Sequence, residues 1–185
     1  TSVKPYKRAA LVGYLDSLDQ MGVFTSPQDQ YNLTYLRNDN WEWSRPTTNE
    51  SKKPILTHFY KKKSDLLYSD LPEFDIHVNP VLYVGYGYDQ DLKEDLFINT
   101  RGAEIRGMID RKIGFYTFLS ENQARLPSYV RSELPFNPVV PHEGFWKGFK
   151  NNAVDFFQAR AYIDFNLTKN IYMQFGHYKT FILER

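Results

Sequence analysis

The sequence predicts a mainly β fold: an antiparallel transmembrane β-barrel of the outer-membrane type, whole or represented by its first strands alone, preceded by a short N-terminal α-helical segment. Apolar and polar residues alternate with a period of two in several segments from residue 74 onward, as in a strand whose two faces meet different surroundings. These segments run to about 12–15 residues, whereas strands of water-soluble proteins are typically about 5 or 6 residues long. Aromatic residues make up 17% of the chain, which suits strands and membrane interfaces.

The composition argues against several classes of protein. The 23 basic and 22 acidic side chains give a net charge of +1, so no broad electrostatic field indicates a nucleic-acid partner. The absence of cysteine from the sequence excludes disulfides, thiolate catalysis and cysteine zinc sites. No apolar run reaches the roughly 18 residues of a spanning helix. The first residues lack the apolar core of a signal peptide, so we expect that an exported chain has already lost its signal.

The first part of the chain is expected to be helical and periplasmic. In residues 4–22, leucine and tyrosine recur at intervals of three and four, which predicts a short amphipathic helix. Ser26, with a proline after it, is a suitable N-cap for a second helix. Residues 44–54 are polar and rich in turn formers, so we place a boundary there. The predicted domains are a helical segment, residues 1–53, and barrel strands, residues 54–185.

Strands are expected throughout the second part. In the stretch FDIHVNPVLYVGYGYD, the even positions from Phe74 to Tyr88 are apolar, aromatic or proline, while Asp75, His77 and Asn79 occupy odd positions. Residues 55–60 form a weaker pattern, typical of a short strand or a connector. The strong strands are expected at residues 74–88, 96–109, 112–123, 155–166 and 170–181.

Alternation alone leaves open which solvent touches which face. In a soluble sandwich the apolar face is buried, whereas in an outer-membrane barrel it touches lipid and the polar face borders water. The connections favour the barrel, because tight polar turns at 109–113 and 165–171 fall on one side and the long stretch 124–152 falls on the other. Five or six strands are fewer than the roughly eight of the smallest such barrel. The chain is therefore the front part of a larger barrel, a sheet completed by another chain, or a soluble sheet.

Residues 54–177 contain the stretches FYKKKSDLLY, FDIHVNPVLYVGYG, TRGAEIRGMIDRKIGFYTFLSENQARLPSYV and FFQARAYIDFNLTKNIYMQFGH. Together these stretches resemble the outer-membrane gliding-motility family called RemB, which is related to the Wzi-type capsule-assembly barrels. The resemblance implies a periplasmic helical segment, a many-stranded barrel and a role at the cell surface connected with polysaccharide or adhesion, with no catalytic residues. The ending YKTFILER departs from the family pattern, in which an acidic residue and a glycine-rich stretch follow FGH.

Two groups of residues are candidates for binding, and none is a candidate for catalysis. Polar side chains of the strands could bind a sugar or an ion inside the barrel, or form a charge-paired, solvated interior. Aromatic and charged side chains of the outer loop could bind sugars, or pack the loop and the membrane interface. The interior candidates are Asp75, His77, Glu104, Arg106, Arg160 and Asp164. The outer-loop candidates are Tyr129, Arg131, Phe136, Glu143, Phe145, Trp146 and Lys147.

Motifs for other chemistry are missing from the sequence. The four histidines, His58, His77, His142 and His177, have no short metal-binding spacing, and Ser120 and Ser128 lack the glycines of a nucleophile elbow. We expect a non-enzymatic outer-membrane protein without cofactor or metal, which contacts outer-membrane lipid and acts in capsule assembly or gliding motility. Its further partners would be surface polysaccharide and other envelope proteins, and not nucleic acid. Two alternatives stay open: a soluble β-rich carbohydrate-binding or hydrolytic domain, and a subunit of a larger envelope complex.

Overall fold

The structure, a computed structural model, describes residues 3–4, 8–44, 49–141, 143–178 and 181–182. The chain divides into two compact units, each described here by itself. The first unit comprises Thr1–Tyr68 with Lys179–Arg185, and the second comprises Ser69–Tyr178. The predicted boundary at residue 53 therefore lies inside the first unit.

The first unit contains the two predicted helices, α1 (Arg8–Gln20) and α2 (Pro27–Asp39). The apolar side chains of Val12, Leu15 and Leu33 are buried. Ser26 caps α2 as predicted: its Oγ accepts from the Asp29 backbone N–H (3.1 Å), and the Asp29 carboxylate accepts from the Ser26 N–H (3.3 Å). This capping box satisfies donors that the first turn of a helix leaves free.

The remainder of the first unit has little regular structure among its described residues. Residues 55–60, expected as a short strand or a connector, form a connector: these residues make turns, with a single bridge between Ile55 and Phe59. Three residues in this stretch, Leu56, Thr57 and Tyr60, have positive φ, which is incompatible with an extended strand. At the ends of the described chain, β1 (Val3–Lys4) pairs antiparallel with β9 (Phe181–Ile182).

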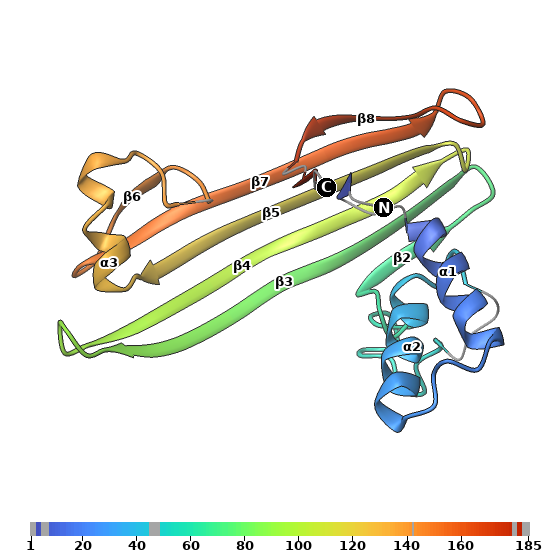
Figure 1. The fold of residues 1–185 in the computed structure, drawn as a ribbon, viewed down its shortest axis with the longest axis horizontal. Coiled ribbons are helices and arrows are strands. Elements are labelled where there is room, and N and C mark those ends of the chain that lie inside the picture. The colour runs from blue at the N-terminus through green and yellow to red at the C-terminus, as the bar shows by residue number, and fades with distance from the viewer. Residues whose placement is uncertain (1–2, 5–7, 45–48, 142, 179–180, 183–185) are drawn as a thin grey trace. The chain divides into compact units, whose positions relative to one another are not determined.

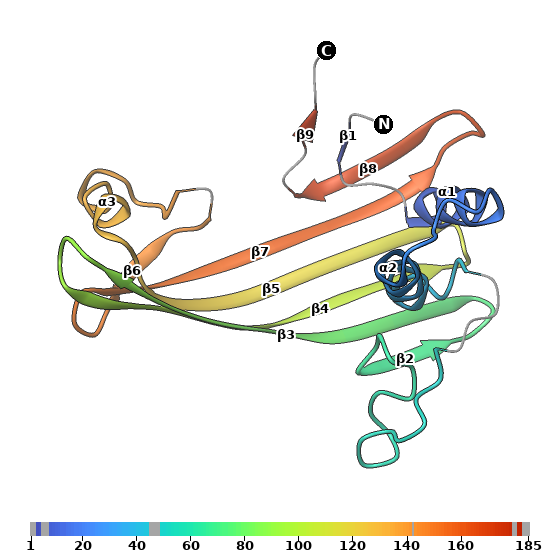
Figure 2. The same ribbon diagram turned by 60° about the horizontal axis from the view of Figure 1, so that its bottom comes forward.

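An antiparallel sheet of long strands dominates the second unit, so the mainly β prediction is confirmed (Figures 1 and 2). Along the sheet the order is β2-β3-β4-β5-β7-β6, with β8 also paired to β7. The strands are β2 (Leu67–Asp70), β3 (Phe74–Asp89), β4 (Glu94–Ile109), β5 (Ile113–Arg125), β6 (Trp146–Phe149), β7 (Ala153–Asn166) and β8 (Tyr172–His177). The tight β4–β5 turn forms as expected, with positive φ at Asp110 and Arg111, as in turns that match strand twist.

The sheet is not closed among the described residues: it ends at β2 on one side and at β6 and β8 on the other, so these strands do not show a barrel, and the three alternatives for an unclosed sheet stay open. One expectation about the sheet needs correction. The last strand, expected over 170–181, covers only Tyr172–His177. Residues 179–180 lie outside the described part, and Phe181–Ile182 pairs with β1 instead.

The long stretch between β5 and β7 folds back against the sheet. It contains a short helix, α3 (Ser128–Arg131), a single 3-10 turn, η1 (Leu134–Phe136), and β6. Two of its apolar side chains, Leu134 and Val140, join three from β5 and β7 in one buried cluster. The sheet members of this cluster are Ala124, Val154 and Phe156, and Ile98, Leu126 and Trp146 pack against it.

Candidate functional site

The register of the strands brings all six interior candidates to one face of the sheet, which we call the polar face. Directly paired residues of antiparallel strands lie on the same face. His77 pairs with Arg106, and Glu104 and Arg160 both pair with Phe118. Asp75 pairs with Met108, which pairs with Gly114, which pairs with Asp164. The register therefore places the six candidates on one shared face.

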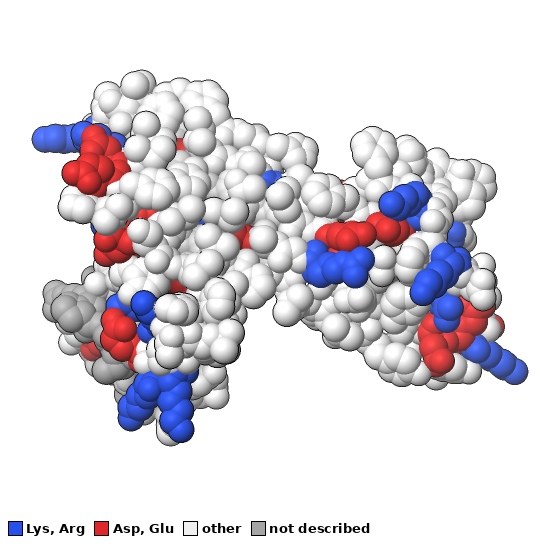
Figure 3. Space-filling view, turned by 180° about the vertical axis from the view of Figure 1, so that it is seen from behind, with Lys and Arg blue, Asp and Glu red and all other residues white. Residues whose placement is uncertain are grey.

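The opposite face, which we call the apolar face, carries aliphatic and aromatic side chains from the β4–β5 turn to the middle of the strands. Figure 3 views the molecule from behind, where a broad area without charged side chains borders a cluster of blue and red groups. Large apolar side chains on this face are exposed in the described structure. They are Leu82, Val84, Ile109, Ile113, Leu119, Phe157, Ile163 and Phe175.

At the β4–β5 end of the polar face the charged groups are paired. Nη1 of Arg111 lies 2.9 Å from Oδ2 of Asp75, and the other guanidinium nitrogen contacts Asp70. The second carboxylate oxygen of Asp75 is 3.6 Å from Nε2 of His77. Both Asp75 and His77 are buried, and a buried carboxylate requires such a partner. These contacts support a structural role for the group at this end.

Further along the polar face, tyrosine rings gather beside the charged groups. The rings of Tyr116 and Tyr162 are stacked with centroids 5.1 Å apart, and Tyr178 packs edge-on against both. The Tyr116 hydroxyl donates to Oε2 of Glu104 over 3.3 Å. The Arg160 guanidinium lies 5.3 Å from the centre of the Phe118 ring. Aromatic surfaces beside fixed polar groups are the usual lining of a ligand site.

At the other end of the strands, two acidic side chains hold α3 to the β3–β4 turn. Asp89 and Glu94 are directly paired. One oxygen of Asp89 accepts from the Ser128 backbone N–H (2.7 Å), and Glu94 forms an ion pair with Arg131 (3.0 Å). The other Asp89 oxygen accepts from the N–H groups of Asp91 and Leu92.

These bonds favour the charged carboxylate of Asp89. The backbone N–H groups of Ser128 and Leu92 lower the pKa of Asp89 to about 2. Sequence reasoning missed this contact, although the acidic residues that flank the turn DQDLKE are a visible signal. The partner of the turn lies more than 30 residues away along the chain, so local patterns could not identify it.

The outer-loop candidates divide into three groups. Arg131 is engaged by Glu94, and the Trp146 indole N–H donates to the backbone carbonyl of Asn137 (2.9 Å) while its ring packs on the buried cluster. These two residues stabilise the loop. Nζ of Lys147 lies 3.6 Å from Oδ2 of Asp155, and the Lys147 side chain is otherwise exposed. The remaining four candidates, Tyr129, Phe136, Glu143 and Phe145, are exposed and stay predicted ligand contacts.

Comparisons of the chain with protein-family models, with curated proteins and with solved structures found no match. Within the described ranges, no three or more histidine, aspartate or glutamate side chains are placed to hold a metal ion; His142 lies outside these ranges. No helix among the described residues has the length and apolar character needed to cross a membrane. The resemblance to RemB therefore stays a prediction.

Proposed function

We propose that this chain is part of an outer-membrane β-barrel protein of a Gram-negative cell envelope. Its apolar face contacts lipid, its polar face borders a water-filled interior, and it acts without catalysis in capsule assembly or in gliding motility. The observation that carries the proposal is the exposed apolar face of unusually long strands. An apolar surface of this extent is rare on a water-soluble monomer and marks contact with a partner or a membrane.

The dimensions of the apolar face suit a bilayer. From Phe74 to Val84 the apolar positions of β3 extend over ten residue steps, about 33 Å at about 3.3 Å per residue. With a strand tilt of about 35–45°, this length corresponds to about 23–27 Å along the membrane normal, near the ~25 Å apolar band of known barrels. Tyr86, Tyr88 and Phe97 follow on the same face, where an aromatic girdle is expected.

The two faces exchange their character near the Val84 end of this band. On the apolar face, Arg101 and Glu121, in register with Leu82, form an ion pair (3.0 Å). On the polar face at the same end, Phe156 and its neighbours form the buried cluster under the outer loop. A soluble sandwich would keep one face apolar along the full strand, whereas a sheet that leaves the bilayer for water must bury the opposite face there. The exchange therefore favours the membrane reading over the soluble alternative.

The open edges of the sheet require further strands in a membrane. Unpaired backbone groups in lipid cost several kcal/mol each, so the described strands would be completed by more strands of the same protein or by another chain. The second possibility is the proposed subunit of a larger envelope complex. Isolation from membranes with a second barrel chain would distinguish it from a single-chain barrel.

A role in polysaccharide handling is supported by the side chains that face water. The tyrosines and charged groups of the polar face, and the exposed Tyr129, Phe136 and Phe145 of the outer loop, offer ring surfaces and hydrogen-bonding groups of the kind that bind sugars. The resemblance to gliding-motility and capsule-assembly barrels also supports a role in polysaccharide handling. Binding and guiding a polymer requires no catalytic group.

The proposal is tested by fractionation of cells that produce the protein. We expect it in the outer-membrane fraction, extracted only by detergent, with a gel mobility that shifts on heating because a folded barrel resists denaturation without heat. A periplasmic β-rich protein of similar size, prepared in parallel, is the control. A chain that is monodisperse in buffer without detergent would overturn the proposal and favour the soluble carbohydrate-binding alternative.

A further inference from the structure

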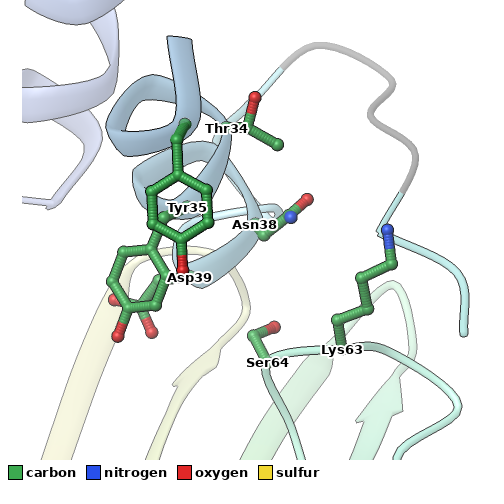
Figure 4. Close-up of a pocket in the computed structure, with 7 residues that line it drawn as sticks. Thr34, Tyr35, Asn38, Asp39, Lys63 and Ser64 are labelled. Carbon is green, nitrogen blue, oxygen red and sulfur yellow. The ribbon is translucent and has the colours of Figure 1, made fainter. Parts of the chain in front are cut away.

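The first unit contains a cavity of about 370 Å³ on the surface of α2 (Figure 4). Its volume lies within the range of small-molecule sites, about 300–1,000 Å³. The lining combines two aromatic rings with hydroxyl, amide, carboxylate and ammonium groups. The lining residues are Tyr31, Thr34, Tyr35, Asn38, Asp39, Lys63 and Ser64.

One face of α2 supplies most of this lining. Residues three and four apart on a helix lie on the same side, and the five lining residues between 31 and 39 follow this spacing. Leu33, between them, is buried on another side of the helix. Tyr31 and Tyr35 are 65% and 62% exposed, although their rings could have been buried against a neighbour. The exposure of two adjacent tyrosines beside a cavity needs an explanation other than packing.

The two walls of the cavity are joined by the buried side chain of Asn49. Its Nδ2 donates to the backbone carbonyl of Asn38 on α2 (3.2 Å) and to Oγ of Ser64 on the opposite wall (3.3 Å). Its Oδ1 accepts from the backbone N–H of Lys63 (3.1 Å). One buried amide therefore fixes the distance between α2 and residues 63–64. A cavity that is held open in this way binds a ligand without paying to order its walls.

Further hydrogen bonds support each wall from behind. Buried Asp65 accepts from the Trp41 indole N–H (2.6 Å) and from the Ser64 hydroxyl (3.1 Å). At the end of α2, Nη1 of Arg8 donates to the backbone carbonyl and the carboxylate of Asp39 (2.9 and 3.1 Å). These hydrogen-bonded polar groups thus hold the residues that line the cavity in position.

We propose that this cavity binds a neutral sugar unit of a glycan. Sugars present apolar C–H faces that pack on aromatic rings and hydroxyls that need both donors and acceptors, and the lining supplies all of these. The lining contains one charged side chain of each sign, Lys63 and Asp39, and the Asp39 carboxylate is paired with Arg8. Oδ1 of Asn38 is buried without a hydrogen-bond partner among the described residues.

This inference does not rest on the barrel proposal, because every residue that carries it belongs to the first unit. The purified full chain is examined by saturation-transfer NMR and by titration with cellobiose, maltose and N,N′-diacetylchitobiose, with inorganic phosphate as the anionic probe. We expect saturable binding of at least one disaccharide. The Tyr35→Ala and Tyr31→Ala variants should each weaken this binding at least tenfold.

A matched control is available on the other helix of the same unit. Tyr14 of α1 is 63% exposed and lies outside the cavity lining, so Tyr14→Ala should leave the affinity unchanged. Because all three tyrosines are exposed, the variants should keep the circular dichroism spectrum of the parent chain. The proposal is overturned if none of the disaccharides binds, if only phosphate binds, or if Tyr14→Ala weakens binding as much as Tyr35→Ala. Loss of binding in Phe136→Ala instead would assign the sugar to the outer loop and also overturn it.

Discussion

The buried cluster under the outer loop gives the sharpest prediction for stability. Phe156 is 4% exposed and packs with Ala124, Leu134, Val140 and Val154. Truncation of a buried phenylalanine to alanine removes its burial free energy and leaves a cavity, at a cost of about 3–5 kcal/mol. Because the loop members of the cluster depend on this ring, Phe156→Ala should mainly open the loop. The opening equilibrium should rise by about two to three and a half powers of ten, at about 1.4 kcal/mol per power.

The next residue of the same strand is the control. Phe157 is 55% exposed on the opposite face, so Phe157→Ala creates no cavity and should cost about 1 kcal/mol, roughly half of a full side-chain burial of 1.5–3 kcal/mol. Hydrogen exchange of the Val140 amide, which donates to the Gly144 carbonyl (2.9 Å), reports on the loop directly. If the two variants accelerate this exchange equally, the conclusion that the buried cluster lies on one face of the sheet alone is refuted.

Three further predictions concern local contacts. The folded-state pKa of Asp89, about 2, lies below its ordinary value of 3.8. The Asp89 carboxylate therefore stabilises the Ser128 contact fully above about pH 4, and this stabilisation is lost as the pH falls through about 2. Pepsin should cleave the outer loop faster at pH 2 than at pH 4, and an equal rate at both would contradict this. Ser26→Ala should destabilise the first unit by about 0.5–2 kcal/mol through loss of the α2 cap, measured by urea titration of its helical signal; an unchanged midpoint would count against the cap. Gly102→Ala places a Cβ against the backbone oxygen of Leu119 in β5, whereas Gly87→Ala meets only side-chain atoms at 3.6 Å or more. Hydrogen exchange should show that the first substitution disrupts β4–β5 pairing and that the second does not, and equal behaviour would rule out the close approach.

Most of the sheet could be predicted because the patterns that specify it lie within single strands and short turns. The period of two from Phe74 onward fixes which side chains share a face, and the short polar turn after Ile109 fixes the pairing of β4 with β5. The register then placed distant residues such as His77 and Arg106 opposite each other without further assumption. The cap of α2 was predictable for the same reason, since Ser26 and Asp29 lie within one helical turn.

Features that depend on distant residues could not be predicted. The contact of Asp89 with Ser128 and the linkage of two cavity walls by Asn49 join segments that no sequence period connects. Asn49 lies in the polar stretch 44–54, where the sequence predicts only a connector, because an asparagine in a turn-rich stretch is typically solvated. The final strand, predicted over 170–181, is shorter in the structure because its described pairing with β7 ends at His177. Closure of the sheet depends on further strands that pair with its edges, and the alternation within one strand does not show how many such strands there are.

The central claim is that the apolar face touches hydrocarbon up to the middle of the strands and water beyond it. Leu119 and Gln123 lie on this face of the same strand, one on each side of the Arg101–Glu121 ion pair. A nitroxide spin label at each position, with the chain reconstituted in lipid vesicles, can be tested for collision with oxygen and with a water-soluble nickel complex. We predict that the label at 119 collides preferentially with oxygen and the label at 123 with nickel. Equal access of nickel to both positions would contradict the claim.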